Sequence, residues 1–208
     1  MSKNAMKEKL GKIALQGLLK QVRACDICAS HLPHGPRPVV QAGTEARLLI
    51  VGQAPGRIVH ETGIPWNDAS GDRLRQWLNL PREVFYDESQ VAIVPTAFCY
   101  PGKGKSGDLP PRPECAPAWH PRLLAALPQV RLTLLIGRYA QEWYLRENCK
   151  STLTETVAAY SEYLPAYFPL PHPSPRNQAW WKANPWFERE VLPELRRRVA
   201  STLAATFK

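Results

Sequence analysis

Three groups of residues in this chain of 208 residues combine reactive side chains with a spacing that could bring them together. The first is Gly52–Gly56 (GQAPG), which is followed closely by Gly63–Gly71 (GIPWNDASG). Two glycines around a proline make a rigid turn whose backbone can approach a ligand. An aromatic ring and polar groups suited to stacking and general-base chemistry lie nearby: His60, Glu61, Trp66, Asn67 and Asp68. The segment is thus either a binding loop or, as the alternative, a structural turn.

The second group consists of four cysteines, Cys25, Cys28, Cys99 and Cys115. The first two form a CxxC that presents two thiolates on one turn, and Cys99 follows an expected strand. Four thiolates suit either tetrahedral zinc or an iron–sulfur cluster, and the alternative is a set of unrelated buried thiols. The remaining cysteine, Cys149, lies in a polar context without a partner and is expected to be structural.

The third group is His172–Asn177 (HPSPRN). Two prolines fix the backbone on either side of Ser174, so that His172 and Asn177 are held in a stiff loop, as pre-organised catalysis requires. The alternative is a proline-rich turn that contains a hydrogen-bonded histidine.

The composition restricts the partners. The chain carries 27 Lys and Arg against 18 Asp and Glu, a formal net charge of +9. This charge favours polyanions, nucleic acid before an anionic membrane surface. The longest apolar runs, such as Leu48–Val51 and Leu132–Ile136, are far shorter than the ~18 residues of a spanning helix, so we expect no membrane partner. A hydrophobic content of 44% excludes a disordered chain, and 21 prolines predict many fixed loops.

Short apolar runs that alternate with amphipathic segments predict the elements that position these groups. Strands are expected at Arg47–Val51, Val91–Val94, Arg131–Ile136 and Tyr167–Leu170. Helices are expected at Lys7–Arg23, Gly71–Leu80 with Ser70 as N-cap, Glu114–Leu127, Gly137–Arg146 and Pro185–Ala205, the last interrupted at Pro193. Long loops are expected at Gly52–Ser70 and Phe98–Pro113.

This order predicts an α/β fold, a three-layer α/β/α arrangement with a central four-stranded parallel sheet. We expect a single domain over residues 1–208, with an N-terminal helix and CxxC arm, residues 1–30, packed on it. Ligands of such sheets bind beyond the carboxyl ends of the strands. Gly52–Gly56, Cys99–Gly107 and His172–Asn177 each follow a strand, so these three loops are predicted to line one cleft.

In this order and at these separations, the three groups resemble the uracil-DNA glycosylase superfamily over about residues 20–200. GQAPG with Gly63-x-Pro-Trp66 and Ser70-Gly71 looks like motif 1 of its family 4, which reads GEAPG and then GxPF. HPSPRN resembles motif 2 and is closest to the single-strand-selective branch. The four cysteines fall at the spacing of the 4Fe-4S ligands of that family, and zinc is kept as the alternative.

The resemblance implies a base-flipping enzyme that hydrolyses the N-glycosidic bond of uracil or another deaminated base in DNA, in base excision repair. The base would stack on Trp66, which stands where the family has Phe, in a pocket formed with Ala54, Asn67 and Phe98. His172 would donate to the base carbonyl or stabilise the anionic leaving base. The DNA-binding loop would consist of Pro173, Ser174, Pro175, Arg176 and Asn177, with Arg176 as wedge or phosphate contact. We expect a monomeric cytoplasmic protein that acts on double- or single-stranded DNA.

Two departures from the family pattern bear on the chemistry. Gln53 stands at the catalytic motif 1 position of the family glutamate and cannot act as a base. Asp68, or alternatively Glu61, would supply the missing carboxylate, unless Asp68 is merely a helix N-terminal charge. Pro95 stands where the family has an asparagine that reads the base, so Asn67 or backbone groups near Phe98 would have to replace it.

Two competing functions remain open at this point. A non-catalytic nucleic-acid-binding member that has lost the water-activating carboxylate would explain Gln53. A small-molecule hydrolase using Ser174 and His172 is weaker, because Ser174 lies between prolines rather than on a strand–turn–helix elbow.

Overall fold

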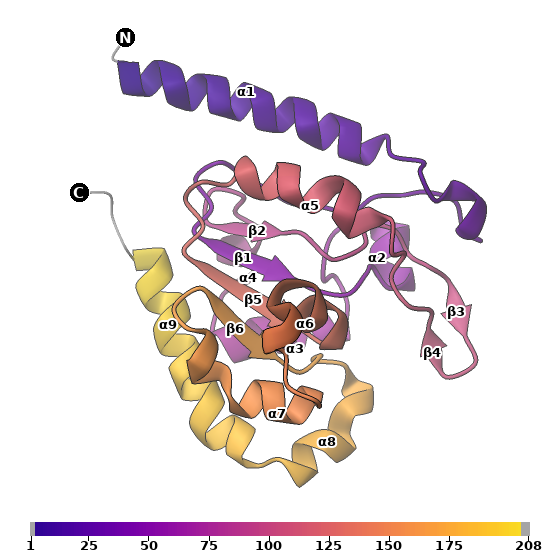
Figure 1. Ribbon diagram of the computed structural model, residues 1–208, viewed down its shortest axis with the longest axis vertical. Coiled ribbons are helices and arrows are strands. Elements are labelled where there is room, and N and C mark those ends of the chain that lie inside the picture. Colours follow the sequence, from indigo (N-terminus) through magenta and orange to yellow (C-terminus); the bar gives the residue numbers. More distant parts are fainter. Residues whose placement is uncertain (1–2, 205–208) are drawn as a thin grey trace.

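A parallel sheet of four strands forms the centre of the molecule in the computed structural model, which describes residues 3–204 (Figure 1). The strands are β1 (Leu48–Val51), β2 (Val91–Ile93), β5 (Leu132–Ile136) and β6 (Tyr167–Leu170), in the order β2-β1-β5-β6. Every residue of β1, β2 and β5 is buried, which explains their continuous apolar sequences.

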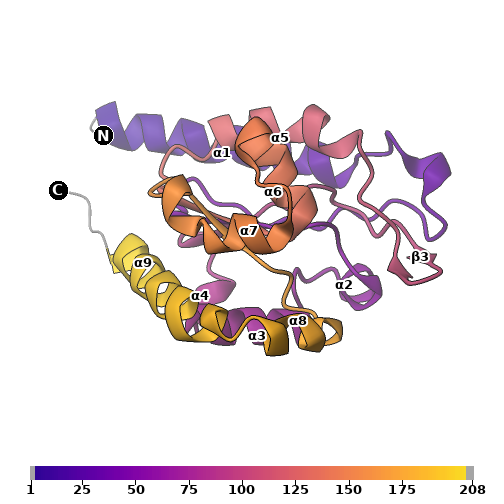
Figure 2. The same ribbon diagram turned by 60° about the horizontal axis from the view of Figure 1, so that its bottom comes forward.

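Helices cover both faces of this sheet (Figures 1 and 2). Alternate residues of β1 point to opposite faces. Leu49 and Val51 pack in one core with α1 (Lys3–Arg23), α5 (Cys115–Ala125) and α6 (Arg138–Leu145). Leu48 and Ile50 pack in another with α3 (Ala69–Leu78), α4 (Arg82–Phe85) and α9 (Leu192–Ala204). The predicted three-layer α/β/α fold with a central parallel sheet is therefore confirmed.

The N-terminal helix α1 carries the CxxC segment at its end. Its buried side chains, Leu15, Leu18, Leu19 and Val22, join the core that contains α5. Arg122 of α5 also donates a hydrogen bond of 2.7 Å to the Gln21 side chain. These contacts fix the end of α1, and with it Cys25, against α5.

Several short elements were missed by the sequence analysis. The predicted loop Gly52–Ser70 contains α2 (Arg57–Thr62), and Phe98–Pro113 contains a hairpin of β3 (Lys103–Gly104) and β4 (Gly107–Asp108). The short helices α4, α7 (Leu153–Ala158) and α8 (Gln178–Ala183) were also not predicted. Single-turn and two-residue elements are too short to show a periodic pattern, so the sequence signal was absent.

Two details of the helix predictions need correction. Ser70 does not cap α3, because the helix begins at Ala69 and Asp68 is the N-cap, with its Oδ1 accepting the Gly71 N–H at 2.9 Å. The irregularity expected at Pro193 lies before it, as the π-helical turn Phe187–Val191 that leads into α9. The last predicted helical residue, Ala205, lies outside the described residues. None of the helices within residues 3–204 is long and apolar enough to cross a membrane.

Candidate active site

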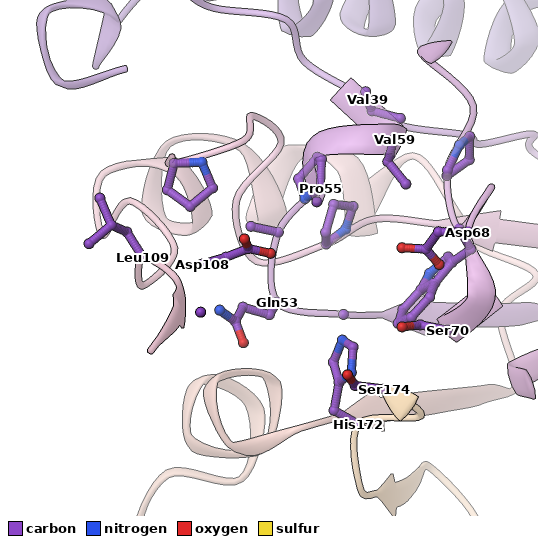
Figure 3. A pocket seen from close by; sticks show the side chains of 18 of the residues that line it. Val39, Gln53, Pro55, Val59, Asp68, Ser70, Asp108, Leu109, His172 and Ser174 are labelled. Atoms are coloured by element: carbon purple, nitrogen blue, oxygen red, sulfur yellow. The ribbon is translucent and has the colours of Figure 1, made fainter. Parts of the chain in front are cut away.

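A cavity of about 370 Å³ opens at the carboxyl ends of the strands, and residues from all three predicted loops line it (Figure 3). We call it the polar cavity. Its lining from these loops comprises Gly52, Gln53, Ala54, Pro55 and Gly56, then Pro101, Ser106 and Gly107, and finally His172, Ser174, Arg176 and Asn177. The prediction that the three loops share one cleft is confirmed.

The turn after β1 is fastened to the chain that continues from β2. The N–H of Thr96 donates to the Gly52 carbonyl at 2.9 Å, and the N–H of Ala97 donates to the Gln53 carbonyl at 3.0 Å. The Thr96 hydroxyl also donates to the Gln53 carbonyl, at 2.6 Å. These bonds fix the backbone of the turn and leave the Gln53 side chain in the cavity (Figure 3).

Two glycines leave the space that Trp66 occupies. A Cβ at Gly52 would lie 2.8 Å from the Trp66 ring, and a Cβ at Gly71 would lie 1.7 Å from the Trp66 carbonyl oxygen. Trp66 itself has a left-handed backbone, with φ of 55°. Its ring lies 5.6 Å from the His172 ring, at 35° to it. The indole and the imidazole therefore form adjoining parts of the cavity wall.

His172 is positioned by its own loop. The Asn177 side chain donates a 2.7 Å hydrogen bond to the His172 carbonyl. Burial lowers the pKa of His172 below its usual value, and the negative charge of Asp68 opposes this shift only in part. The imidazole is therefore neutral near pH 7 and available as a hydrogen-bond donor or acceptor in the polar cavity.

The rest of the HPSPRN loop divides into buried and exposed parts. Ser174 caps the short helical turn Pro175–Asn177, because its hydroxyl accepts the Arg176 N–H at 3.3 Å. Pro175 and Arg176 are exposed, whereas Pro173 is buried. The expectation that Pro173 belongs to the DNA-binding surface is therefore not supported by its position. The role of Ser174 as a cap also gives no support to a nucleophilic serine.

Two carboxylates line the polar cavity, Asp68 from the start of α3 and Asp108 from β4 (Figure 3). The alternative, Glu61, is not among the lining residues and instead pairs with Arg57 at 2.6 Å on the exposed side of α2. Asp108 was not identified by the sequence analysis. It follows no strand that the sequence revealed and belongs to no recognisable motif, so no local signal could have singled it out.

Asn67 and Phe98 are not brought to the polar cavity. The Asn67 side chain accepts a hydrogen bond of 3.0 Å from Arg82, and Phe98 is buried beside the cysteines. The backbone near Phe98 is also engaged, since its N–H donates to the Cys115 sulfur at 3.4 Å. Pro95 does line the polar cavity, and its carbonyl accepts a hydrogen bond of 2.9 Å from His120 Nε2.

The four predicted cysteine ligands line a second, much smaller cavity, together with Pro38, Ala97, Phe98 and Arg112. We call it the cysteine cavity. Trp119 Nε1 donates to the Cys25 sulfur at 3.3 Å, as the Phe98 N–H does to Cys115. Burial raises the pKa of the Cys99 thiol to about 11 and that of Cys115 to about 12. Cys149 lies apart, 3.7 Å from the Thr156 hydroxyl.

Four free thiols form the donor set of the cysteine cavity. Within residues 3–204, no three His, Cys, Asp or Glu side chains converge closely enough to hold a metal ion. The four free thiols nevertheless face one enclosed space, and two of the sulfurs accept N–H groups, as the cysteine sulfurs of iron–sulfur proteins do. Four thiols that three separate segments bring to one enclosure suit a cluster that takes one thiolate at each iron atom.

A protein-family model matches most of the chain. The model of the family described as "Uracil DNA glycosylase superfamily" matches residues 40–196, well over half of the chain. The matched segment runs from before β1 into α9 and contains all of the residues that line the polar cavity from Gly52 to Asn177. Cys99 and Cys115 lie inside the match, whereas Cys25 and Cys28 lie before it.

Proposed function

The chain belongs to the uracil DNA glycosylase superfamily, and from this premise we propose that it is a monofunctional DNA glycosylase. It hydrolyses the N-glycosidic bond of an extruded uracil or another deaminated base, in base excision repair. The observation that carries the proposal is the polar cavity, in which Trp66 and Asp68 of one loop come together with His172 of another.

In the proposed reaction the base enters the polar cavity and stacks on Trp66. His172, neutral near pH 7, donates a hydrogen bond to the base as negative charge develops on it, and a short contact of this kind strengthens in the transition state. The Asn177 side chain holds the His172 backbone, so that the imidazole need not reorganise during the reaction.

The attacking water needs a carboxylate, because the side chain of Gln53 carries no negative charge. Asp68 is the carboxylate we propose to hold and orient this water. Its Oδ1 accepts the Gly71 N–H, so the side chain is fixed at the start of α3 while it faces the cavity. Asp68→Asn is expected to lower turnover roughly 10²- to 10⁴-fold while DNA binding stays nearly unchanged.

DNA is the proposed partner, consistent with the net charge of +9. Extrusion of a base costs a few kcal/mol, so a glycosylase needs a surface that holds the strand on either side of the pocket. The exposed Pro175 and Arg176, directly after His172 and Ser174, are proposed to contact the backbone or to fill the space that the base leaves.

For the cysteine cavity we propose a 4Fe-4S cluster held by Cys25, Cys28, Cys99 and Cys115. Its proposed contribution is structural, since it would tie the end of α1 to the chain after β2. Protein purified without oxygen should be brown, absorb near 400 nm and contain about four iron atoms per chain. Colourless protein with one zinc per chain would show that the four cysteines bind zinc instead of a cluster.

A panel of lesion oligonucleotides tests the proposed activity. Single- and double-stranded DNA with a central uracil, hypoxanthine or xanthine is incubated with the protein and then treated with alkali. A monofunctional glycosylase leaves an abasic site, so breakage should appear after alkali and not before it. Tight, salt-dependent binding without breakage on any substrate would instead identify a non-catalytic DNA-binding protein.

A further inference from the structure

The polar cavity contains a second carboxylate that faces the same point as Asp68. A Cβ at Gly56 would lie 3.9 Å from Asp68 Oδ2 and 3.7 Å from Asp108 Oδ2. Both oxygens thus lie within 4 Å of one point beside the Gly56 Cα. Asp68 and Asp108 come from different segments, the start of α3 and the strand β4, so this convergence is a product of the fold.

The backbone at Gly56 does not require glycine. Its φ of −81° and ψ of 176° are extended values that any residue adopts. The feature that glycine provides here is space, because a side chain would enter the volume between the two carboxylates. A volume that is bounded by two acceptors and kept free of side chains is suited to a water molecule, which can donate one hydrogen to each acceptor.

Each carboxylate is held through one oxygen and presents the other. Asp68 Oδ1 accepts the Gly71 N–H at 2.9 Å, and Asp108 Oδ1 lies 3.5 Å from the Tyr100 hydroxyl, which donates a weak hydrogen bond to it. In both side chains it is Oδ2 that faces the space above Gly56. The orientation of both groups is therefore fixed before any ligand arrives.

The hairpin that carries Asp108 is itself anchored. The backbone of Lys103 lies opposite that of Asp108 in the two-stranded antiparallel sheet. The Leu109 N–H donates a hydrogen bond to the Gly102 carbonyl at 2.9 Å. Arg176 of the HPSPRN loop lies against the hairpin, because its Nη1 is 3.1 Å from the position of a Cβ at Gly107. The loop that carries His172 and the strand that carries Asp108 thus meet over the cavity.

We infer that Asp68 and Asp108 together hold the attacking water in the space above Gly56, and that Asp108 receives its proton. This inference rests on the proposed glycosylase function and explains how a chain with Gln53 performs it. The water oxygen bonds to C1′ of the flipped nucleotide as the bond from C1′ to the base breaks. The electron pair of that bond leaves with the base, which His172 stabilises. The water proton passes to Asp108, which caps no helix, so its protonation leaves the first turn of α3 intact.

Single-turnover cleavage of the substrate found in the lesion panel tests the inference. Asp108→Asn should lower the rate roughly 10²-fold or more, with unchanged affinity for an uncleavable analogue. Gly56→Ala should also slow cleavage, because a methyl group beside the two carboxylates narrows the space that is left for the water. The double variant should be no slower than Asp108→Asn alone, since both changes disable the same step, the activation of one water.

Glu61→Gln is the matched control, because it neutralises a carboxylate that lies outside the cavity, on the exposed side of α2. It should leave the rate within about twofold of wild type, and the melting temperatures of all variants should show that they are folded. If wild type cleaves and Asp108→Asn cleaves equally fast, the inference is wrong and the proposed function stands. If wild type cleaves no lesion, the proposed function fails and the inference falls with it.

Discussion

The polar cavity and the cysteine cavity share one stretch of chain and have opposite characters. Pro95 lines the first, and Ala97, Phe98 and Cys99 line the second. The polar cavity is large and is lined by carboxylates and an imidazole, whereas the cysteine cavity is small and is enclosed by thiols and apolar groups. The difference predicts that substitutions in the first change chemistry with the fold intact, and that substitutions in the second change the fold itself.

His120 connects the two regions. Its ring stacks on Phe98 at 5.9 Å, and its Nε2 lies 2.9 Å from the Pro95 carbonyl. Since a carbonyl can only accept, Nε2 must carry the hydrogen, and Nδ1 then accepts from the Tyr144 hydroxyl at 2.8 Å. A neutral histidine therefore braces the strip from Pro95 to Phe98 on which both cavities depend.

The largest effect is expected from Cys99→Ser. Structural metal sites contribute on the order of 10 kcal/mol to folding, so loss of one ligand should remove the proposed cluster and most of the folded protein. Circular dichroism, melting temperature and iron content measure this. Cys149→Ser is the control and should leave all three at wild-type values. If the Cys99→Ser protein is as stable as wild type, folding does not depend on the cysteine cavity.

His172→Gln should give the next largest effect, and one of the opposite kind. Loss of a group that stabilises developing charge should lower the single-turnover rate about 10²- to 10³-fold, with the melting temperature unchanged. His31→Gln, at an exposed position, serves as the matched control. A variant that melts early but keeps its rate would show that His172 supports the fold rather than the chemistry.

Acid should destabilise the strip between the cavities. Burial lowers the pKa of His120 to about 4, against about 6.5 in the unfolded chain, so the unfolded state binds more protons between these values. The stability from neutral His120 is complete above pH 6.5 and is lost as the pH falls toward 4. Between pH 7 and pH 5 this loss is about 2 kcal/mol.

Urea denaturation at the two pH values measures that loss. The pKa values of His60 and His172 are lowered by burial too and act in the same sense. His120→Gln should therefore reduce the difference between pH 7 and pH 5 without abolishing it. An undiminished difference in this variant would assign the acid sensitivity to other groups.

The smallest effect is expected from Arg176→Ala at the rim of the polar cavity. Removal of one phosphate contact should weaken DNA binding equally for different sequences and reduce the slope of log affinity against log salt by about one. Lys20→Ala makes the same charge change at an exposed position of α1 that does not line the polar cavity, so its salt slope should stay that of wild type. Equal slopes for both variants would show that Arg176 makes no phosphate contact.

Much of the fold could be predicted from local patterns. The four strands are short, continuously apolar runs, since both faces of the sheet are covered, and their predicted positions agree with the structure to within one or two residues. The elements that were missed, such as α2 and the β3–β4 hairpin, owe their conformation to neighbouring glycines and to contacts across the cavity. Such contacts join residues that are distant in sequence, so no periodic pattern records them.

The order of strands along the chain was enough to predict that the three chemical loops share one cleft, because parallel strands carry the segments that follow them to the same edge of the sheet. Four of the five cysteines could also be grouped in advance, from their CxxC and from the spacing that resembles the family. Which side chains enter the cleft depends on the folded structure. Asp68 and Asp108 face Gly56, while Glu61, Asn67 and Phe98 do not line the cavity. The direction of a side chain depends on backbone angles, such as the left-handed φ at Trp66, and on contacts with residues far along the chain. Local sequence patterns predict neither of these.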